Sequence, residues 1–273
     1  MKKGLLKKIF ATALVGVMAV SLIACGAKKE EKDSLSAIKE NKKVIVGLSA
    51  DYAPYEFHTM VDGKDQTVGF DVELAKEVAK DMGVELEIKE MDFDALIGAL
   101  QAGQVDMIIS GMNPDDERKK QIDFSDIYYE VQHGVIVNAV DKDKFKTAED
   151  LNGMKIGAQL GSTQQKIAEE KITGAQLTLL ANVNNLVLEL KSGKVSAVIT
   201  EQPVAKIAIK SNPELALSDI TFKDEAGGNA IGLKKDSPEL VAQVNKTIKR
   251  LKDSGDLDKF IITATELAGQ QNS

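Results

Sequence analysis

Lys-Val-Ile-Val-Gly-Leu, residues 43–48, is a short apolar run that predicts a buried β-strand. Apolar residues then recur at helical spacing from Val72 to Met82, and Gly83 is placed to end that helix. Further elements follow in the same alternation: a strand at 86–88, a helix over 94–101 and a strand over 105–110. Strands that alternate with helices pair in parallel, so we predict an α/β protein with a mostly parallel sheet flanked by helices.

The same alternation restarts in the second half of the chain. The expected strands are 155–157, 177–180 and 196–200, and the expected helices are 163–172, 182–192 and 203–210. Between the halves, the apolar stretch 134–137 is long enough to cross from one unit to the other. The C-terminal part predicts a strand near 230–233 and helices over 238–253 and 256–268. The sequence therefore predicts two α/β units.

The N-terminus has the pattern of an export signal. Residues 1–8 carry four lysines and no acid, residues 9–24 are apolar or small, and Cys25 stands in a segment that looks like a bacterial lipobox. The apolar run is short for a membrane span. We expect a lipoprotein signal peptide over 1–24, a lipid on Cys25 and a charged, flexible tether over 25–35. The alternative is a plain membrane anchor with an incidental cysteine.

Composition argues against several classes of function. The chain has a net charge of −7, and an acidic surface disfavours nucleic acid as a partner. Cys25 is the only cysteine, so we expect no intramolecular disulfide. With one cysteine and two histidines, His58 and His133, a typical zinc site or a histidine-based catalytic set is poorly supported. We predict no metal and no cofactor, and we interpret both histidines as structural.

A series of short blocks carries a resemblance to a known family. The blocks are residues 52–57, 68–75, 93–97, 106–112, 117–120, 124–126 and 161–164. In this order and spacing, the chain resembles the extracytoplasmic solute-binding proteins of polar amino-acid ABC importers, of the family 3 type, in their lipoprotein form. The resemblance extends from about Lys42 to Leu267.

This resemblance implies a periplasmic-binding-protein-like fold, in which two lobes joined by two hinge crossings close on one amino acid. The first lobe is expected to comprise residues 36–132 and 228–273, and the second lobe residues 133–227. The protein is then a monomer that does no covalent chemistry. It delivers a free L-amino acid to an ABC permease and its ATPase. Lipid anchoring predicts a location on the outer face of the membrane of a Gram-positive cell.

Arg118 is the candidate partner of the ligand carboxylate, because a guanidinium makes a fixed two-pronged contact with a carboxylate. We expect Asn113 to be the N-cap and Pro114 the first residue of a short helix that carries Arg118. By the resemblance, the backbone N–H of Asn113 also meets the carboxylate. The alternative is a solvated arginine in a run of charged residues.

The second unit offers a group for each charged end of an amino acid. Ser162 and Thr163 stand at the start of a helix, where backbone N–H groups attract anions, so both are predicted site residues and the Thr163 N–H is predicted to contact the carboxylate. An ordinary helix cap is the alternative. The resemblance implies that Glu201 binds the ligand ammonium at a position where the family usually has Asp. Asn113 replaces the more common Thr or Ser, and its amide can accept from an ammonium.

The ligand side chain is expected to meet aromatic rings. Tyr52 and Phe93 match the two positions that sandwich the side chain in the family, and flat rings suit a cation. The alternative is a pair of core aromatics. By the resemblance, Ser110 and Gly111 also belong to the site. Ser49 stands where relatives that take basic ligands often have Asp.

Two nearby acids, Asp51 and Glu56, either compensate for Ser49 or face solvent. On balance we expect arginine, lysine or histidine as the ligand, ahead of glutamine. Two other functions remain open. Some dehydratases share the implied fold, and Glu201 is a candidate general acid. A surface adhesin is the other alternative, because fold alone does not determine function.

Overall fold

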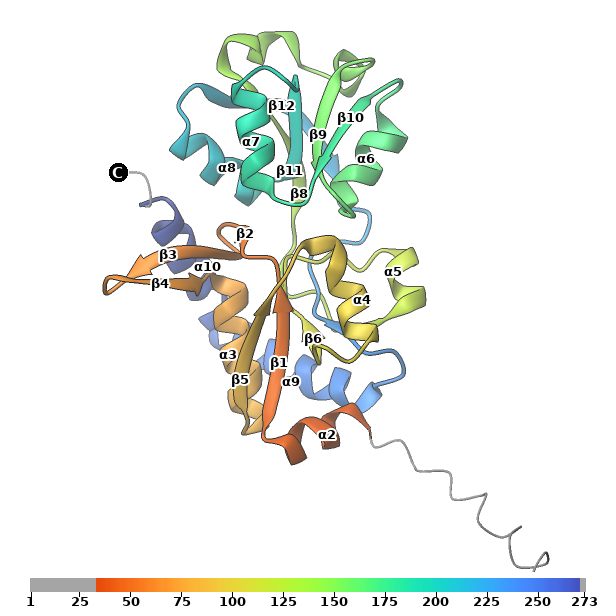
Figure 1. Cartoon of the computed structure of the whole chain (residues 1–273), viewed down its shortest axis with the longest axis vertical. Coiled ribbons are helices and arrows are strands. Elements are labelled where there is room, and N and C mark those ends of the chain that lie inside the picture. The colour runs from red at the N-terminus through yellow and green to blue at the C-terminus, as the bar shows by residue number, and fades with distance from the viewer. Residues whose placement is uncertain (1–32, 271–273) are drawn as a thin grey trace, which may run out of the picture. The chain divides into compact units, whose positions relative to one another are not determined.

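The computed structural model describes residues 33–270 (Figure 1). The predicted signal peptide and Cys25 lie outside these residues. Helix α2 (Ser34–Asn41) begins directly after Asp33, whose carboxylate accepts a hydrogen bond from the N–H of Ser36 at 2.9 Å. The tether predicted over 25–35 therefore overlaps this helix. Ser34 and Leu35 are helical because Asp33 supplies the cap.

The first five-stranded sheet has the strand order β5-β1-β6-β13-β7. Its strands are β5 (Glu85–Glu90), β1 (Lys43–Leu48), β6 (Met107–Ile108), β13 (Gly232–Leu233) and β7 (Asp123–Phe124). Strand β1 pairs in parallel with β5 and β6, whereas β13 runs antiparallel to β6 and β7. Four of these five strands therefore point the same way, which confirms the predicted α/β class with a mostly parallel sheet.

The second five-stranded sheet repeats this plan in the order β10-β9-β11-β8-β12. Its strands are β10 (Gln176–Leu180), β9 (Lys155–Gln159), β11 (Ala197–Glu201), β8 (Gln132–Asn138) and β12 (Leu215–Lys223). Again one strand, β8, is antiparallel to its two neighbours. The predicted crossing stretch 134–137 thus lies within a strand of the second sheet. Strand β12 was not predicted.

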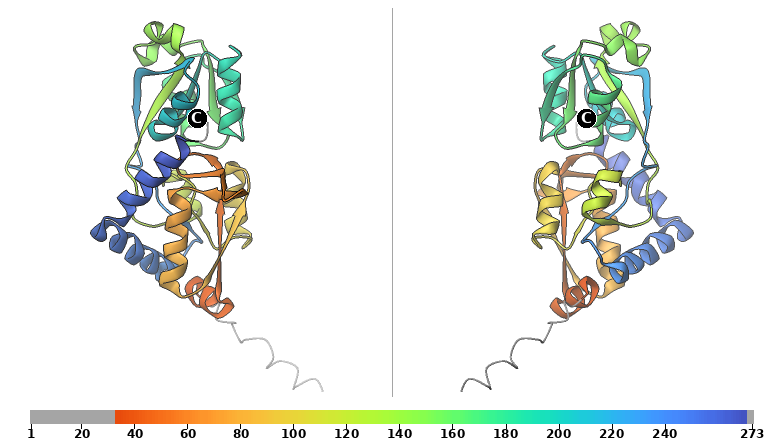
Figure 2. Two further views of the ribbon diagram at one scale, coloured as in Figure 1. Left: turned by 90° about the vertical axis from the view of Figure 1, so that its left-hand side faces the viewer. Right: turned by 90° about the vertical axis from the view of Figure 1, so that its right-hand side faces the viewer.

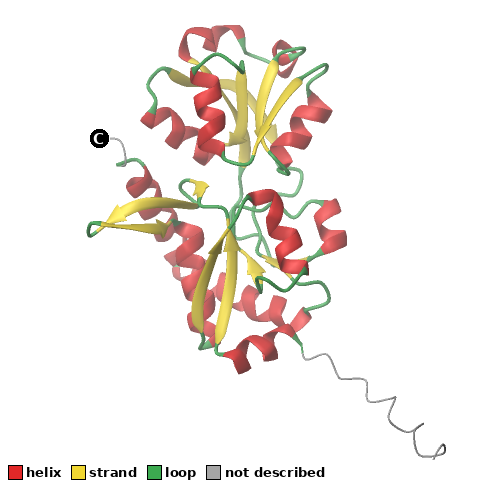
Figure 3. Cartoon of the chain, viewed as in Figure 1, coloured by secondary structure: helices red, strands yellow, loops and turns green. Residues whose placement is uncertain are grey.

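A small antiparallel sheet of order β2-β3-β4 was also not predicted (Figure 3). It comprises β2 (Asp51–Tyr52), β3 (Glu56–Val61) and β4 (Lys64–Val68). Its outer strand is largely exposed and polar, so it lacks the apolar run that marks a buried strand. Its inner end places Asp51, Tyr52 and Glu56 beside the end of β1.

Helices cover both faces of the first sheet (Figure 2). One face packs against α2, α3 (Phe70–Met82), α9 (Pro238–Ser254) and α10 (Asp256–Ala268). The other packs against η1 (Phe93–Ala95) and α4 (Leu96–Gln101). Alternation along β1 explains the two layers, because Val44 and Val46 point to the first face and Ile45 to the second.

The second sheet is layered in the same way. Helix α6 (Thr163–Lys171) covers the face that carries Val135 and Val137. Helices α7 (Val183–Lys191) and α8 (Gln202–Ser211) cover the face that carries Ile136. The remaining helical segments are α5 (Asp116–Gln121), η2 (Ala139–Lys144) and η3 (Ala148–Leu151). Among the helices of residues 33–270, none has the length and apolar character that a membrane span requires.

Candidate functional site

The candidate site lies where parallel strands of both sheets end. Ser49 follows β1, Ser110 and Gly111 follow β6, and Glu201 is the last residue of β11. Carboxyl ends of parallel strands are the usual place for a ligand in open α/β sheets. A small, largely filled pocket lies there and is lined by Ser49, Tyr52, Glu56, Phe93, Gly111, Asn113, Gln159 and Gln164. Five of the ten predicted ligand-binding residues thus line one pocket, and hydrogen bonds connect the others to it.

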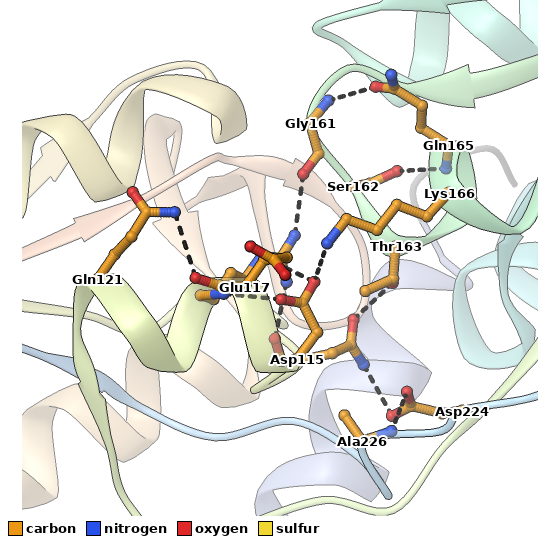
Figure 4. Close-up of polar contacts among 12 residues, drawn as sticks. Asp115, Glu117, Gln121, Gly161, Ser162, Thr163, Gln165, Lys166, Asp224 and Ala226 are labelled. Carbon is orange, nitrogen blue, oxygen red and sulfur yellow. Dashed lines mark hydrogen bonds and ion pairs between the residues drawn. The ribbon is translucent and has the colours of Figure 1, made fainter. Parts of the chain in front are cut away.

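Asn113 is the centre of this network. Its side-chain oxygen accepts a hydrogen bond from Thr163 Oγ1 at 2.9 Å (Figure 4). Its side-chain nitrogen donates to Glu201 Oε1 at 3.2 Å and to Asp224 Oδ2 at 3.0 Å. Asn113 therefore joins the segment after β6 to three residues that belong to or flank the second sheet.

Arg118 is buried beside Asn113. Its guanidinium donates to the carbonyl oxygens of Asn113 at 2.8 Å and of Gly161 at 2.9 Å. The ring of Phe93 lies below it, with the guanidinium carbon 5.3 Å from the ring centroid. Burial lowers the pKa of Arg118, and Asp115, Asp224 and Glu201 oppose that shift. The solvated surface arginine considered above is therefore excluded.

The helix that carries Arg118 begins later than we predicted. Asp115, not Asn113, is the N-cap of α5, since its carboxylate accepts a hydrogen bond from Arg118 N–H at 2.8 Å. Pro114 precedes the helix and is not its first residue. Asn113 does not cap the helix because its side chain forms hydrogen bonds with Thr163 and Glu201 instead. The second oxygen of Asp115 accepts from Lys166 at 2.7 Å (Figure 4).

Ser162 and Thr163 have different roles at the start of α6. Ser162 is the N-cap and accepts a hydrogen bond from Gln165 N–H at 3.2 Å, which supports the ordinary-cap alternative for this residue. Its hydroxyl also donates to the carbonyl of Gln159. Thr163, in contrast, directs its hydroxyl to Asn113. The structure thus brings Thr163 to the network and turns the Ser162 side chain toward its own helix.

Glu201 is wholly buried at the end of β11. Its Oε1 accepts hydrogen bonds from the side chains of Asn113 and of Asn229, the latter at 3.0 Å. Its Oε2 has no hydrogen-bond partner within the described part of the chain. Burial raises the pKa of this carboxyl, and the nearby His133 opposes the shift. A buried carboxylate with an unused oxygen is suited to bind a cation.

Tyr52 extends from the small sheet to the second sheet. Its hydroxyl oxygen lies 3.2 Å from the N–H of Glu201, 3.2 Å from Thr200 Oγ1 and 3.3 Å from Gln164 Nε2. The ring is also in contact with Tyr55, at a centroid distance of 5.3 Å. Tyr52 therefore lines the pocket with its ring and, through its hydroxyl, fixes the end of β11.

Of the remaining predicted residues, Ser49 and Gly111 line the pocket, and Ser110 bonds to lining residues. Ser110 Oγ accepts a hydrogen bond from Ser49 N–H at 3.0 Å and donates to Glu56 Oε1 at 2.5 Å. Gly111 has φ of +51°, and a Cβ there would lie 3.3 Å from the Tyr52 ring, so a side chain would be both strained and crowded. Asp51 and Glu56 are buried, which excludes the expectation that they face solvent.

Several residues of the site had no signal in the sequence. Asp224 and Asn229 lie more than a hundred residues after Asn113 in the sequence. Asp224 accepts a hydrogen bond from the Asn113 side chain, and Asn229 donates to the carbonyl of Gly111 at 2.7 Å. Gln164 belongs to the segment 161–164 that carries the family resemblance, but that resemblance predicts no role for its side chain. His133 was interpreted as structural, but it is buried beside the site, where its Nδ1 lies 3.2 Å from Gln164 Nε2. His58 remains outside the site and contacts Asp65 and Glu90.

Comparisons with known proteins agree with this geometry. The profile of the bacterial extracellular solute-binding proteins, family 3, matches residues 44–263. The arginine-binding extracellular protein ArtP of Bacillus subtilis is 41% identical over 258 residues, covering 93% of this chain and 96% of the relative. The amino acid ABC transporter substrate-binding protein AbpA of Streptococcus pneumoniae, bound to L-arginine, superposes with a TM-score of 0.84. It is 43% identical, and the match covers 86% of this chain and 99% of that chain.

A further solved structure bears on the enzyme alternative. It is AncCDT-1, an ancestral amino-acid-binding protein described as a precursor of cyclohexadienyl dehydratase. Its TM-score is 0.77 at 33% identity, and the match covers 85% of this chain and 99% of that chain. The named function of this neighbour is binding, as it is for the two relatives above. From its matched profile and its relatives, the chain belongs to family 3 of the bacterial extracellular solute-binding proteins.

Proposed function

We propose that this protein is the substrate-binding subunit of an ABC importer for a basic L-amino acid. The observation that carries the proposal is Arg118, a buried guanidinium that donates to the carbonyl of the pocket-lining residue Asn113. Its one ion pair within residues 33–270 is with Asp115, whose oxygen lies 3.8 Å from Nε. A buried cation without a close carboxylate favours an anionic ligand group. The α-carboxylate of an amino acid is such a group, and the start of α6 at Thr163 is close to Arg118, which donates to the carbonyl of Gly161.

The opposite end of the ligand has a partner as well. The unused Oε2 of Glu201 is the group that we assign to the α-ammonium. The side chain of Glu201 is one methylene longer than that of the Asp usual in the family. Asn113 and Asn229 hold its other oxygen, so the extra methylene does not leave the carboxylate unpositioned. Arg118 and Glu201 then select a zwitterion, since each removes the penalty of burying one of its charges.

The pocket favours a cationic side chain over a neutral one. Tyr52 and Phe93 supply ring faces, and Glu56 supplies a buried carboxylate in the pocket lining. Asp51, also buried, accepts hydrogen bonds from Ser49 Oγ and Val183 N–H and is therefore already in use. Glu56 is thus the acid that compensates for the absence of Asp at position 49. We propose arginine, lysine or histidine as the ligand, ahead of glutamine.

The finer features of the proposal extend to location and partners. We propose two lobes, residues 36–132 with 228–273 and residues 133–227, that close on the ligand about two hinge crossings. A lipid on Cys25 would hold this monomer on the outer face of a Gram-positive cell membrane, where it meets a permease and its ATPase. Support comes from the extracellular family and from the pattern of residues 1–26.

Two experiments test the proposed function. Thermal shift against the twenty amino acids should give the largest rise in melting temperature with a basic one. At about 100 times the dissociation constant, the ligand should add roughly 2.7 kcal/mol of stability. Agmatine, which lacks the carboxylate of arginine, should raise the melting temperature little. Equal stabilisation by agmatine and arginine would contradict carboxylate recognition. Incubation with a prephenate-like substrate tests the dehydratase alternative, and we expect no product.

A further inference from the structure

Two wholly buried carboxyls lie side by side beneath the pocket. Glu56 on β3 accepts a hydrogen bond at Oε1 from Ser110, and Asp71 on α3 accepts two at Oδ2, from Gly111 N–H at 2.8 Å and Tyr128 OH at 2.9 Å. Each carboxyl keeps one oxygen that no donor of the described chain reaches, Glu56 Oε2 and Asp71 Oδ1. The two carboxyls are held close together, because their donors Ser110 and Gly111 are consecutive residues and Asp71 N–H donates to the carbonyl of Tyr55, the residue before Glu56, at 3.0 Å.

Two buried carboxyls held this close are stabilised by a proton between them. Ionised carboxylates are acceptors only, so their free oxygens can bond to each other only when one of them carries a proton. The groups around Glu56 and Asp71 favour a proton that stays on the pair. The charged and titratable groups that act on this pair are the acids Asp51 and Glu201 and the phenols Tyr52 and Tyr128. Burial raises the pKa of both carboxyls, that of Asp71 to about 7, and the charge of Asp71 raises that of Glu56 further.

We propose that Glu56 and Asp71 share one proton in the ligand-free protein, and that a cationic ligand side chain expels this proton into solvent. Capture of a basic amino acid is then coupled to proton release. The O–H bond of the pair breaks, water or buffer accepts the proton, and the ligand cation becomes the counter-charge of the ionised pair. The inference rests on the proposed function, since it requires a cation beside Glu56.

The position of Glu56 makes this exchange possible. Glu56 lines the pocket, while Asp71 does not line it and accepts a hydrogen bond from the N–H of the lining residue Gly111. Arg118, the buried cation of the site, does not compensate this pair, because the carboxyls that act on its charge are Asp115, Asp224 and Glu201. The pair therefore receives its compensating positive charge either from a proton or from the ligand.

Calorimetric titration with L-arginine measures the released proton. Titrations at about pH 6.5 in phosphate and in imidazole, which differ in ionisation enthalpy, should show release of about one proton per ligand. Citrulline is the matched neutral ligand, because its α-groups are those of arginine while its side chain carries no charge. It should release none. Equal release by both ligands would assign the proton to Glu201 and overturn the proposal.

A variant separates the pair from its neighbours. In Asp71→Asn, the amide oxygen can accept from Gly111 and Tyr128, and the amide nitrogen can donate to Glu56 permanently. This variant should bind arginine without proton release. Asp106→Asn is the control, since Asp106 is also partly buried with a raised pKa but precedes β6 and bonds to Ile45 N–H. It should release the proton as the wild type does.

The wild type alone provides a further readout if Asp71→Asn does not fold. The dissociation constant for arginine should rise by about tenfold per pH unit as pH falls from about 7 to 5. A constant affinity, together with a binding heat independent of the buffer, contradicts the shared proton. Absence of arginine, lysine and histidine binding at every pH would instead overturn the proposed function.

Discussion

Thr163 donates a hydrogen bond to the side-chain oxygen of Asn113 at 2.9 Å, and this contact determines which way the Asn113 amide points. With its oxygen engaged by Thr163, the amide must direct its nitrogen to Glu201 and Asp224. Thr163, at the start of α6, thus orients the Asn113 amide, and this amide holds Glu201, the proposed partner of the ligand ammonium. The two ends of the proposed amino-acid site are coupled through this single amide.

Thr163→Val should weaken ligand binding about fivefold. Valine has the same shape but lacks the hydroxyl, so the net loss is that of one buried hydrogen bond, about 1 kcal/mol. Thr265→Val serves as the control, because Thr265 bonds only to its own helix at the carbonyl of Ile261 and is exposed. Calorimetric titration with the best ligand compares the two. The same affinity in both variants would show that the Thr163 hydroxyl has no part in the site.

Phe93→Leu should weaken binding in addition to changing the ligand preference. The family resemblance implies contact with the ligand side chain alone, whereas here the ring also lies beneath Arg118. Loss of this cation–π contact is expected to cost about 0.5–2 kcal/mol, roughly twofold to thirtyfold in affinity. Phe124→Leu, in β7 of the first sheet and in the same hydrophobic cluster as Phe93, should leave affinity unchanged. If neither affinity nor the ligand order changes in Phe93→Leu, the ring belongs to the core.

Stability should fall as pH rises from about 4 to about 7. The pKa of Asp71 is raised from 3.8 to about 7 by burial, so the native state binds a proton that the unfolded chain releases. The stability that this group contributes is fully present below pH 3.8 and is lost as the pH rises through about 7.

Urea unfolding of the wild type and of Asp71→Asn at about pH 4.5 and pH 7.5 measures this effect. The variant should lose less stability between the two conditions. Asp62→Asn, at an exposed turn, should behave as the wild type does. Parallel pH dependence in all three proteins would rule out a native-state proton on Asp71.

Cys25→Ala should abolish lipid attachment and signal cleavage, because Cys25 alone follows a lipobox-like segment. Metabolic labelling with palmitate, followed by separation of membrane and medium, is the measurement. Labelling that persists in the variant would contradict the anchor.

The elements that could be predicted are those with a local apolar pattern. β1 matches residues 43–48, and α3 ends at Gly83 as expected, because burial of one face imposes a periodicity that the sequence displays. The β2–β4 sheet was missed since its strands are short or polar. The apolar run of β8 was noticed, but its antiparallel place between β11 and β12 depends on partners far away in the chain.

The site was predictable only as far as motifs extend. Arg118, Asn113, Thr163 and Glu201 carry chemical types that suit an amino acid, and the structure brings them together. Asp115 replaced Asn113 as the helix cap because tertiary contacts engaged the Asn113 side chain, a competition that the local sequence does not reveal. Asp224 and Asn229 reach the site from the return segment before β13, where nothing nearby signals their role.

The measurement that tests the central claim most directly is titration of Arg118 variants with the best ligand. Removing one partner of a buried charge pair costs roughly 3–5 kcal/mol, so Arg118→Ala should bind at least a hundredfold more weakly. Arg118→Lys should recover little, because an ammonium lacks the planar fork. Lys119→Ala, an exposed neighbour, should bind as the wild type does. Circular dichroism confirms that each variant is folded. A folded Arg118→Ala protein that binds within tenfold of the wild type would contradict the proposed site.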